Sequence, residues 1–230
     1  MVGYSSDITA AAVARILEII RQVDLKIRYL QPCTSNMFGK VESETQDEST
    51  PFNPQSPYAV AKTFAYYMTR YYRQAYDMHA SNVILFNHES PRRPADYVTR
   101  KISQSVARIS VGKQSELVLG DTSARVDWGF SGDYVEAEWL AVQQDQADDY
   151  VIATGEAHSV QDFVDAAFAT VGLDPEQYVK SSQEFYRVTP TSTLVGNSEK
   201  AREILGFNPK VSFSNLVRMM VENDLEIEKK

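Results

Sequence analysis

The chain has 230 residues, of which 43% are hydrophobic and 23% are charged, a composition that excludes a globally disordered protein. Its 31 acidic and 23 basic residues leave a formal charge of -8, so general binding to nucleic acids or to anionic membranes is not expected. The single cysteine, Cys33, excludes an intramolecular disulfide and a cysteine-based metal site.

Two kinds of segment are missing from the sequence. No apolar run approaches the roughly 20 residues that span a bilayer, and the first residues lack the basic and apolar regions of a secretory signal. We therefore expect a cytoplasmic protein without a membrane segment. The sequence also has no G-x-G-x-x-G turn between a strand and a helix, the motif that holds dinucleotide phosphates.

The first half of the chain alternates helices and strands. Apolar residues recur at spacings of three and four over 7–24, which predicts an amphipathic helix. A short strand is expected at 27–33, followed by a polar loop over 34–55. Ser56 and Pro57 form a helix-start signal, with a helix expected to about Ala75. This order, completed by a strand from Ser81 to Phe86, predicts an α/β fold with a doubly wound parallel sheet.

The second half is less regular and predicts a smaller, mixed α/β lobe. The expected helices lie at 98–111, 132–144, 160–171, 198–205 and 213–225, and the expected strands at 117–119 and 150–153.

Tyr58 and Lys62 form the clearest chemical pair in the sequence. Their i, i+4 spacing near the start of a predicted helix places both side chains on one face. An ammonium beside a phenol favours the phenolate, so we expect a lowered Tyr58 pKa and a role as general base. A Y-x-x-x-K match also occurs by chance in many helices. Thr34, at the end of the preceding predicted strand, strengthens the functional interpretation because its hydroxyl could bind a substrate oxygen.

Several longer runs resemble the GDP-mannose 4,6-dehydratase family, which belongs to the extended short-chain dehydrogenases/reductases. The most specific is the run Asn-His-Glu-Ser-Pro-Arg-Arg at 87–93. The others include TSNMFG at 34–39, SPYAVAK at 56–62 and YVIATGE at 150–156. The resemblance extends from Tyr4 to the C-terminus. It implies a partial Rossmann-type sheet whose first βαβ units, roughly the first third of such an enzyme, are missing.

The resemblance also implies roles for individual residues. It makes Thr34, Tyr58 and Lys62 catalytic, with Tyr58 as the base for oxidation at C4 of the sugar. The implied contacts to NADP are Tyr4, Lys62, His88 and Arg93, and the implied contacts to the nucleotide sugar, GDP-mannose, are Asn87, Arg125 and Arg187. On base rates alone His88 and Arg93 would more often be structural. The three histidines are scattered without metal-ligand spacing, so no metal is expected.

Three positions depart from the family pattern. Asn36 stands where the family has a catalytic glutamate, and an amide cannot perform acid-base catalysis of the elimination step. Val126 replaces an arginine expected before Asp127, unless Arg125 substitutes for it. Pro190 replaces a glutamate expected to hold the nucleotide's sugar.

Three functions remain open from the sequence. The first is a GDP-mannose 4,6-dehydratase-like enzyme, the second a nucleotide-sugar C4 epimerase or reductase, and the third an inactive binding or assembly module. We expect 1–90 to form the C-terminal part of the NADP-binding domain and 91–230 to be mainly a substrate-binding lobe. The resemblance further implies a homo-oligomer, a dimer or tetramer, with the loop after Arg92 and Arg93 as a contact.

Overall fold

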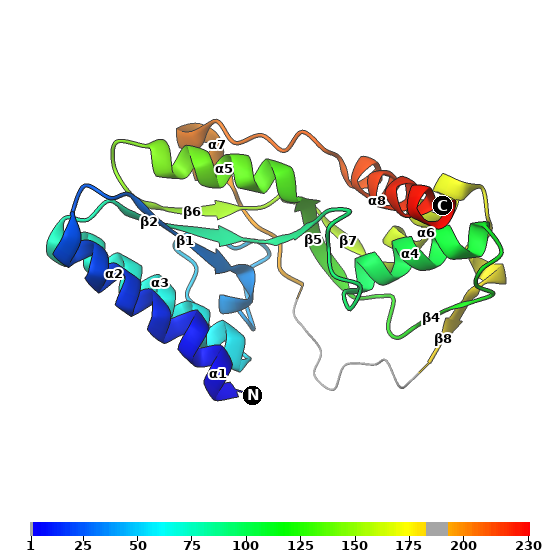
Figure 1. Ribbon diagram of the computed structural model, residues 1–230, viewed down its shortest axis with the longest axis horizontal. Helices are drawn as coiled ribbons and strands as arrows, with labels where there is room; N and C mark the ends of the chain where they lie inside the picture. The colour runs from blue at the N-terminus through cyan, green and yellow to red at the C-terminus, as the bar shows by residue number, and fades with distance from the viewer. Residues whose placement is uncertain (1, 183–192) are drawn as a thin grey trace.

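The computed structural model describes residues 2–182 and 193–230 and has two lobes (Figure 1). The helical segments are α1 (Val2–Ser6), the π-helical η1 (Asp7–Ala11), α2 (Ala12–Val23), the 3-10 turn η2 (Ser35–Met37), α3 (Pro57–Tyr76), α4 (Val98–Ser110), α5 (Ser131–Gln143), α6 (Val160–Val171), the 3-10 turn η3 (Pro175–Gln177), α7 (Glu199–Leu205) and α8 (Phe213–Glu228). The strands are β1 (Tyr29–Thr34), β2 (Ala80–Leu85), β3 (Asn87–Glu89), β4 (Leu117–Leu119), β5 (Arg125–Phe130), β6 (Asp149–Ile152), β7 (Ala157–Ser159) and β8 (Val179–Ser181).

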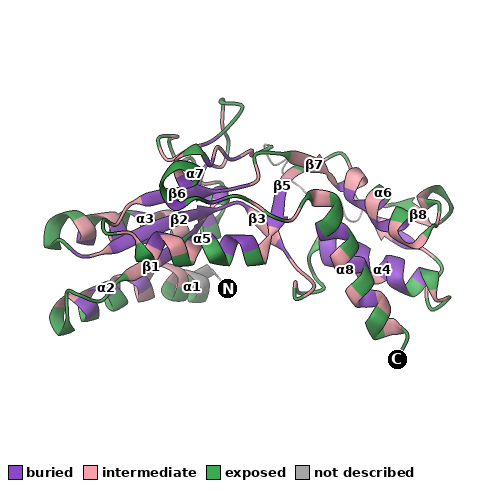
Figure 2. Cartoon of the chain, turned by 90° about the horizontal axis from the view of Figure 1, so that it is seen from above, coloured by how far each residue is buried: buried purple, intermediate pink, exposed green. Residues whose placement is uncertain are grey.

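The first lobe is built on a parallel sheet with the strand order β1-β2-β6. Helices α2 and α3 cover one face of this sheet, and α5 and α7 lie on the other (Figure 1). All six residues of β2 are buried, because this central strand has helices over both faces. Figure 2 shows the same burial along the middle of the lobe. The doubly wound α/β class expected from the sequence is thereby confirmed.

The two edges of this sheet differ. At β6, the backbone N–H of Val151 donates to the Glu48 carboxylate at 2.6 Å, so the loop before α3 covers that edge. At β1, Tyr29 N donates to His79 O at 2.8 Å, and the alternation along the strand therefore directs the backbone groups of Pro32 away from β2. A proline, which has no N–H, is tolerated there because the β1–β2 ladder does not need its donor.

The second lobe holds two small sheets, β3-β5-β7 and the parallel pair β4-β8. Helices α4, α6 and α8 pack around one hydrophobic cluster, which includes Val106, Trp128, Phe163 and Met220. Trp128 from β5 packs edge-on against Phe163 from α6, with the ring centroids 5.6 Å apart. The aromatic contact thus connects the small sheet to the helices behind it.

Asp127, in β5, links the two lobes. Its side chain is buried, with 1% exposed, and its carboxylate accepts hydrogen bonds from Thr154 N at 3.0 Å, Gly155 N at 3.0 Å and Gly196 N at 3.2 Å. Thr154 and Gly155 follow β6 of the first sheet, whereas β5 belongs to the second lobe. One carboxylate therefore holds three separate segments of the chain together.

The predicted helices and longer strands agree with the structure to within three residues at each end, except that the first predicted helix continues back through η1 and α1. The short strands β3, β7 and β8 and the six-residue β5 were not predicted. Residue 90 is the expected boundary between the two parts of the chain. After that residue, α5, β6 and α7 return to the first sheet, so the two lobes exchange segments.

Candidate functional site

The centre of the candidate site lies where β1 ends and α3 begins. Ser56 caps α3 by accepting a hydrogen bond from Ala59 N at 3.1 Å, and this fixes the first turn that carries Tyr58. Thr34 is the last residue of β1, and its hydroxyl is close enough to Tyr58 to lower that residue's pKa. Lys62 lies one turn further along α3, with Nζ 5.9 Å from the centroid of the Tyr58 ring. The fold thus brings the three predicted catalytic residues together.

The titration of Tyr58 differs from the expectation. Burial is the largest influence and raises the Tyr58 pKa, while the Thr34 hydroxyl acts in the opposite direction. Lys62 turns its ammonium to the carbonyl of Pro32, at 2.8 Å, and its own pKa is lowered by burial. The predicted lowering of the Tyr58 pKa by Lys62 is therefore wrong for this structure. The lysine is within reach of the phenol but is engaged elsewhere.

Asn36 lies directly beside this pair. It is exposed in the turn η2, and its backbone N–H donates to Thr34 Oγ1 at 3.3 Å. The amide therefore occupies the neighbourhood in which the family's glutamate is expected. No proton-accepting side chain is supplied by this position.

Arg93 is held in a fixed orientation near Tyr58. Its guanidinium carbon lies 3.4 Å from the Tyr97 ring centroid, and its Nε is 3.3 Å from the Glu89 carboxylate. Glu89 is buried and also accepts a hydrogen bond from Thr99 at 2.8 Å. Tyr97 raises and Arg93 lowers the Tyr58 pKa electrostatically, each less than burial does.

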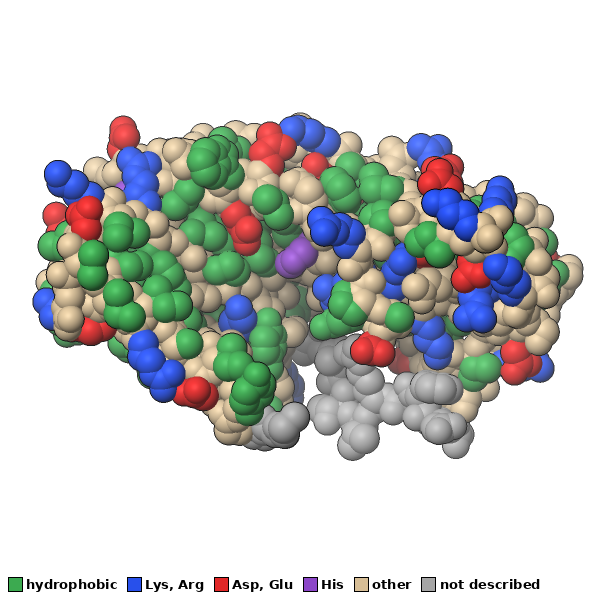
Figure 3. Space-filling model, in the orientation of Figure 1, with side chains coloured by type: hydrophobic (Ala, Val, Ile, Leu, Met, Phe, Trp, Pro, Cys, Tyr) green, Lys and Arg blue, Asp and Glu red, His purple; other side chains and the backbone are tan. Residues whose placement is uncertain are grey.

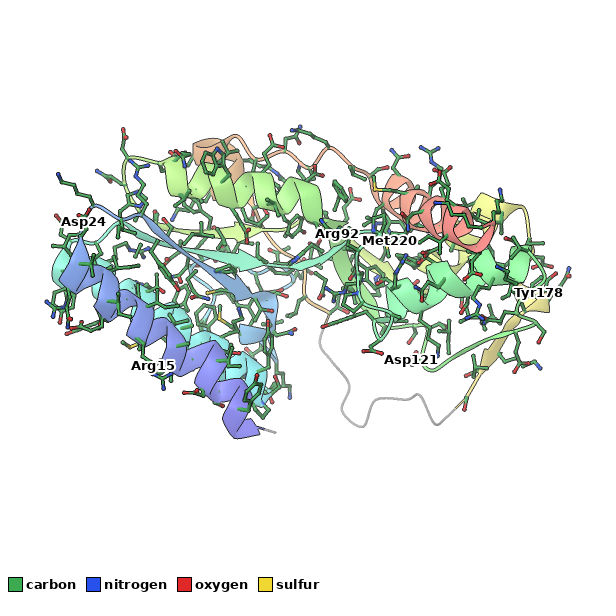
Figure 4. The ribbon with its side chains drawn as sticks, viewed as in Figure 1. Arg15, Asp24, Arg92, Asp121, Tyr178 and Met220 are labelled. Atoms are coloured by element: carbon green, nitrogen blue, oxygen red, sulfur yellow. The ribbon has the colours of Figure 1, made fainter. Side chains whose placement is uncertain are left out.

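Figure 4 labels the neighbouring Arg92 at the junction of the two lobes. Sequence reasoning gave no role to Glu89, Tyr97 or Thr99. Glu89 stands within the run at 87–93, but the only signal for the other two residues is their proximity to that run in the sequence.

His88 and Asn87 come from β3, which pairs with β5. His88 Nδ1 is 2.9 Å from the Phe86 carbonyl, and its ring lies 5.2 Å from the Tyr134 ring. Burial lowers the His88 pKa, and the positive charge of Arg93 lowers it further. The hydrogen bond to the Phe86 carbonyl opposes this shift in part, so the net lowering of the His88 pKa favours the neutral imidazole, which can serve as a hydrogen-bond partner.

The remaining predicted residues lie apart from this centre or outside the described residues. Tyr4 is in α1, 68% exposed, and α1 packs against α3. Arg125 begins β5 and donates to the carbonyl of Ala157 in β7. In the described part of the chain, no hydrogen bond or ion pair joins Tyr4 or Arg125 to Tyr58. Arg187 and Pro190 lie outside the described residues.

The site offers donors for an anionic ligand. Arg93 directs its buried Nε to the Glu89 carboxylate at 3.3 Å, and 22% of its side chain remains exposed. Such a guanidinium suits a phosphate group or a hydroxyl of a ribose.

Among residues 2–182 and 193–230, no group of three His, Cys, Asp or Glu side chains could hold a metal ion. Over the same residues, no helix is long and apolar enough to cross a membrane.

A family model and the curated relatives that match this chain all describe the same family. A family model described as GDP-mannose 4,6 dehydratase matches residues 3–220. The chain is 47% identical to GDP-mannose 4,6 dehydratase 1 of Arabidopsis thaliana, covering 99% of this chain and 64% of the relative. It is 41% identical to GDP-mannose 4,6 dehydratase of Homo sapiens, covering 97% of this chain and 65% of the relative. The chain thus spans slightly less than two thirds of these relatives.

Solved structures share the fold at lower identity. The structure of RMD from Pseudomonas aeruginosa complexed with NADPH matches with a TM-score of 0.86 and 16% identity, over 96% of this chain and 74% of that one. The dTDP-glucose 4,6-dehydratase from Bacillus anthracis in complex with NAD matches with a TM-score of 0.85 and 18% identity, over 97% of this chain and 70% of that one.

Proposed function

The chain belongs to the GDP-mannose 4,6-dehydratase family, and from this premise we propose that it contributes the sugar-oxidising part of an NADP-dependent GDP-mannose 4,6-dehydratase site. In that reaction C4 of the mannose is oxidised, water is lost across C5 and C6, and a GDP-4-keto-6-deoxy sugar results. The observation that carries the proposal is that the end of β1 and the start of α3 bring Thr34 next to Tyr58, with Lys62 one turn away.

Each of these three residues has a chemical task in the proposal. Thr34 polarises the C4 hydroxyl, and Tyr58 removes its proton as hydride leaves the same carbon. A ligand that attracts Lys62 away from the Pro32 carbonyl would bring a positive charge closer to the phenol and favour the phenolate. The raised Tyr58 pKa of the free protein is therefore compatible with a base that becomes active when the site is filled.

The cofactor is proposed from the positions of basic side chains. Lys62, His88 and Arg93 would hold a nicotinamide cofactor, which accepts the hydride when bound. A well-oriented arginine such as Arg93 suits the additional phosphate that distinguishes NADP from NAD. Tyr4 remains a predicted cofactor contact. Arg125 and Arg187 remain predicted contacts to the diphosphate of the substrate, and Asn87 remains a predicted contact to the substrate.

A second candidate function follows from Asn36. Without a carboxylate beside Thr34, the site keeps C4 oxidation and reduction but lacks the group for removing the C5 proton. This favours C4 epimerisation or reduction of a 4-keto sugar as the alternative. A site without turnover, in an inactive binding module, is the third outcome of the test below.

We also propose the wider organisation from the same premise. The first sheet with α3 forms the cofactor side, corresponding mainly to 1–90, and the second lobe within 91–230 binds the nucleotide sugar. The protein acts as a homo-oligomer. Because its one cysteine, Cys33, is buried and free, a reducing compartment such as the cytoplasm suits it.

The test supplies the chain with the nucleotide-binding segment of the Arabidopsis thaliana relative, by fusion, and follows GDP-mannose by NADPH absorbance and product mass. We expect slow formation of the 4-keto-6-deoxy product. The Asn36→Glu variant should accelerate it by about 100- to 10,000-fold, the usual contribution of a general acid-base. Tyr58→Phe should abolish turnover, whereas Tyr76→Phe, at the far end of α3, should not change it.

The outcomes separate the three functions. Cofactor reduction without water loss in the fusion protein would support the epimerase or reductase alternative. If neither the parent fusion nor Asn36→Glu turned over although both bound NADP, the inactive binding module would be the better description.

A further inference from the structure

A charged network lies inside the first lobe, behind the candidate site. Its centre is Asp149, the first residue of β6, which is 5% exposed. The Asp149 carboxylate accepts hydrogen bonds from the Tyr66 hydroxyl at 2.8 Å and from Asn82 Nδ2 at 2.9 Å. It also pairs with Arg73 at 2.9 Å and with Arg70 at 3.6 Å. The charged side chains in Figure 3 are spread over the surface of both lobes, whereas this carboxylate is buried.

A buried ion pair of this kind fixes geometry more than it adds stability. Taking charged groups out of water costs free energy that their attraction barely repays, so apolar residues of the same volume would often be as stable. Hydrogen bonds are directional, however, and a connected network specifies one arrangement of the elements that it joins. The elements joined here are α3, β2 and β6. The network therefore sets how α3 lies on the first sheet.

Helix α3 carries members of the network and the two catalytic candidates on one stripe. Four residues follow one another at intervals of four, namely Tyr58, Lys62, Tyr66 and Arg70. Side chains at this spacing lie on the same side of a helix. Tyr66 lies eight residues, or about 12 Å, beyond Tyr58 along the helix axis. A rotation of α3 that broke the network would therefore also turn Tyr58 away from Thr34.

The other contacts of the first turns of α3 restrain such a rotation only weakly. Over 57–65, the buried side chains of the helix are Ala59, Ala61 and Ala65. Alanine methyl groups form low ridges, so they let the helix approach the sheet closely without interlocking with it. The Ser56 cap bonds to Ala59 within the same helix and does not attach the helix to the sheet. The directional bonds of the network supply that attachment.

The network also reaches the strand that ends in Thr34. Asn82 is fully buried, and its Oδ1 lies 3.6 Å from Cys33 Sγ on the neighbouring strand β1, a distance at which the thiol is a weak donor. Asn82 Nδ2 donates to Asp149 and also to the backbone carbonyl of Tyr66, at 3.3 Å. One amide thus connects the strand of Thr34 with a turn of α3.

We propose that Asp149, with Tyr66 and Asn82, is a positioning group that sets the rotation of α3 and thereby the approach of Tyr58 to Thr34. A rotation of about 10° would move an atom about 6 Å from the helix axis by about 1 Å. A displacement of this size in a catalytic group can cost about 100-fold in rate. The effect on rate rests on the proposed function, whereas the effect on the position of Tyr58 does not.

The position of Tyr58 is measured by fluorine NMR on the chain alone, labelled at that residue with 3-fluorotyrosine. Asp149→Asn removes the charge at nearly constant volume, and Tyr66→Phe removes one hydrogen bond but keeps the ring. We expect both variants to shift and broaden the Tyr58 resonance, because the phenol leaves its fixed place beside Thr34. Circular dichroism shows whether each variant is folded. If Asp149→Asn does not fold, Tyr66→Phe decides the test.

Each variant has a matched control. Tyr67→Phe makes the same change at the next residue of α3, whose side chain is 54% exposed. Asp224→Asn removes an equally buried carboxylate from the second lobe, where Asp224 is 2% exposed, accepts a hydrogen bond from Ser103 at 2.7 Å and pairs with Arg100. Both controls should leave the Tyr58 resonance in place, although Asp224→Asn should lower the unfolding midpoint. A general loss of stability is thereby separated from a displaced helix.

Turnover gives a second readout, in the fusion protein described above. Tyr66→Phe should lower kcat by about 10- to 100-fold at unchanged KM for GDP-mannose, because it misplaces the base without touching the substrate. A Tyr58 resonance that folded Tyr66→Phe leaves unmoved, or that both controls move equally, would overturn the positioning role. An inactive parent fusion would count against the proposed function alone, since the resonance does not depend on turnover.

Discussion

Replacing Asp127 by alanine tests whether one carboxylate holds the two lobes together. The side chain accepts backbone hydrogen bonds from Thr154, Gly155 and Gly196, and the Thr154 hydroxyl bonds to it as well. A buried donor left without a partner costs about 1–3 kcal/mol. Gly196 N–H is buried, whereas Gly155 is exposed and can turn to water. We therefore expect a loss of about 2–4 kcal/mol in the free energy of unfolding.

The assay is urea unfolding followed by circular dichroism, with the slope of the transition monitored for loss of two-state behaviour. Asp121→Ala is the matched control, because this exposed aspartate also accepts a backbone hydrogen bond, from Ser123 N at 2.8 Å, but in solvent. It should leave the unfolding midpoint nearly unchanged. Equal effects of the two substitutions would refute the linking role of Asp127.

Two further predictions concern local structure. Ser159→Ala removes the capping box of α6 and should cost about 1 kcal/mol, measured by thermal unfolding. Hydrogen bonds from Ser159 lower the Asp162 pKa in the folded state below its ordinary value of 3.8. The stabilisation that the ionised Asp162 carboxylate contributes is therefore complete above pH 3.8, and it is lost as the pH falls through the lower pKa of the folded state. Only the part of the Ser159→Ala effect that acts through the Asp162 carboxylate should disappear in acid, because the cap on Asp162 N does not titrate and the Ser159 backbone N–H remains in the variant. A difference that grows as the pH falls would contradict the pair. Gly196→Ala places a Cβ 2.9 Å from the Phe86 ring and 2.2 Å from Ala153 Cβ. It should therefore lower the free energy of unfolding of the protein by about 1–3 kcal/mol. An unchanged unfolding midpoint would contradict the close packing.

The helices were predictable because their signals are local. The segment from Val160 to Val171 has a serine before it, a glycine after it and apolar residues at helical spacing, and the structure has these bounds. The strand β5 was missed because it carries Asp127 and Gly129 in its middle, both unfavourable in strands. They are retained because Asp127 links the lobes and Gly129 leaves room for the Tyr134 ring, 2.3 Å from where a Cβ would stand.

Some residues of the candidate site could likewise be predicted from local signals, and others could not. Thr34, Tyr58 and Lys62 could be predicted, because the end of one strand and the first turn of the next helix meet in any parallel α/β layer. The Arg93 cluster could not, because Glu89 and Tyr97 meet it only through the turn between β3 and α4. The raised Tyr58 pKa also depends on burial and on where Lys62 points, neither of which follows from residue spacing.

The outward side of β1 has a consequence for aggregation. Among residues 2–182 and 193–230 no strand pairs with this side, and a strand edge without a partner is a template on which other strands can add. At the centre of this edge Pro32 offers no N–H, and its carbonyl is already occupied by Lys62 and by the Gln31 side chain at 2.7 Å. An added strand would lose both central hydrogen bonds. The lysine assigned to chemistry thus also occupies a backbone acceptor on this side of β1 in the described chain, so variants at Lys62 intended to test catalysis will also free that carbonyl.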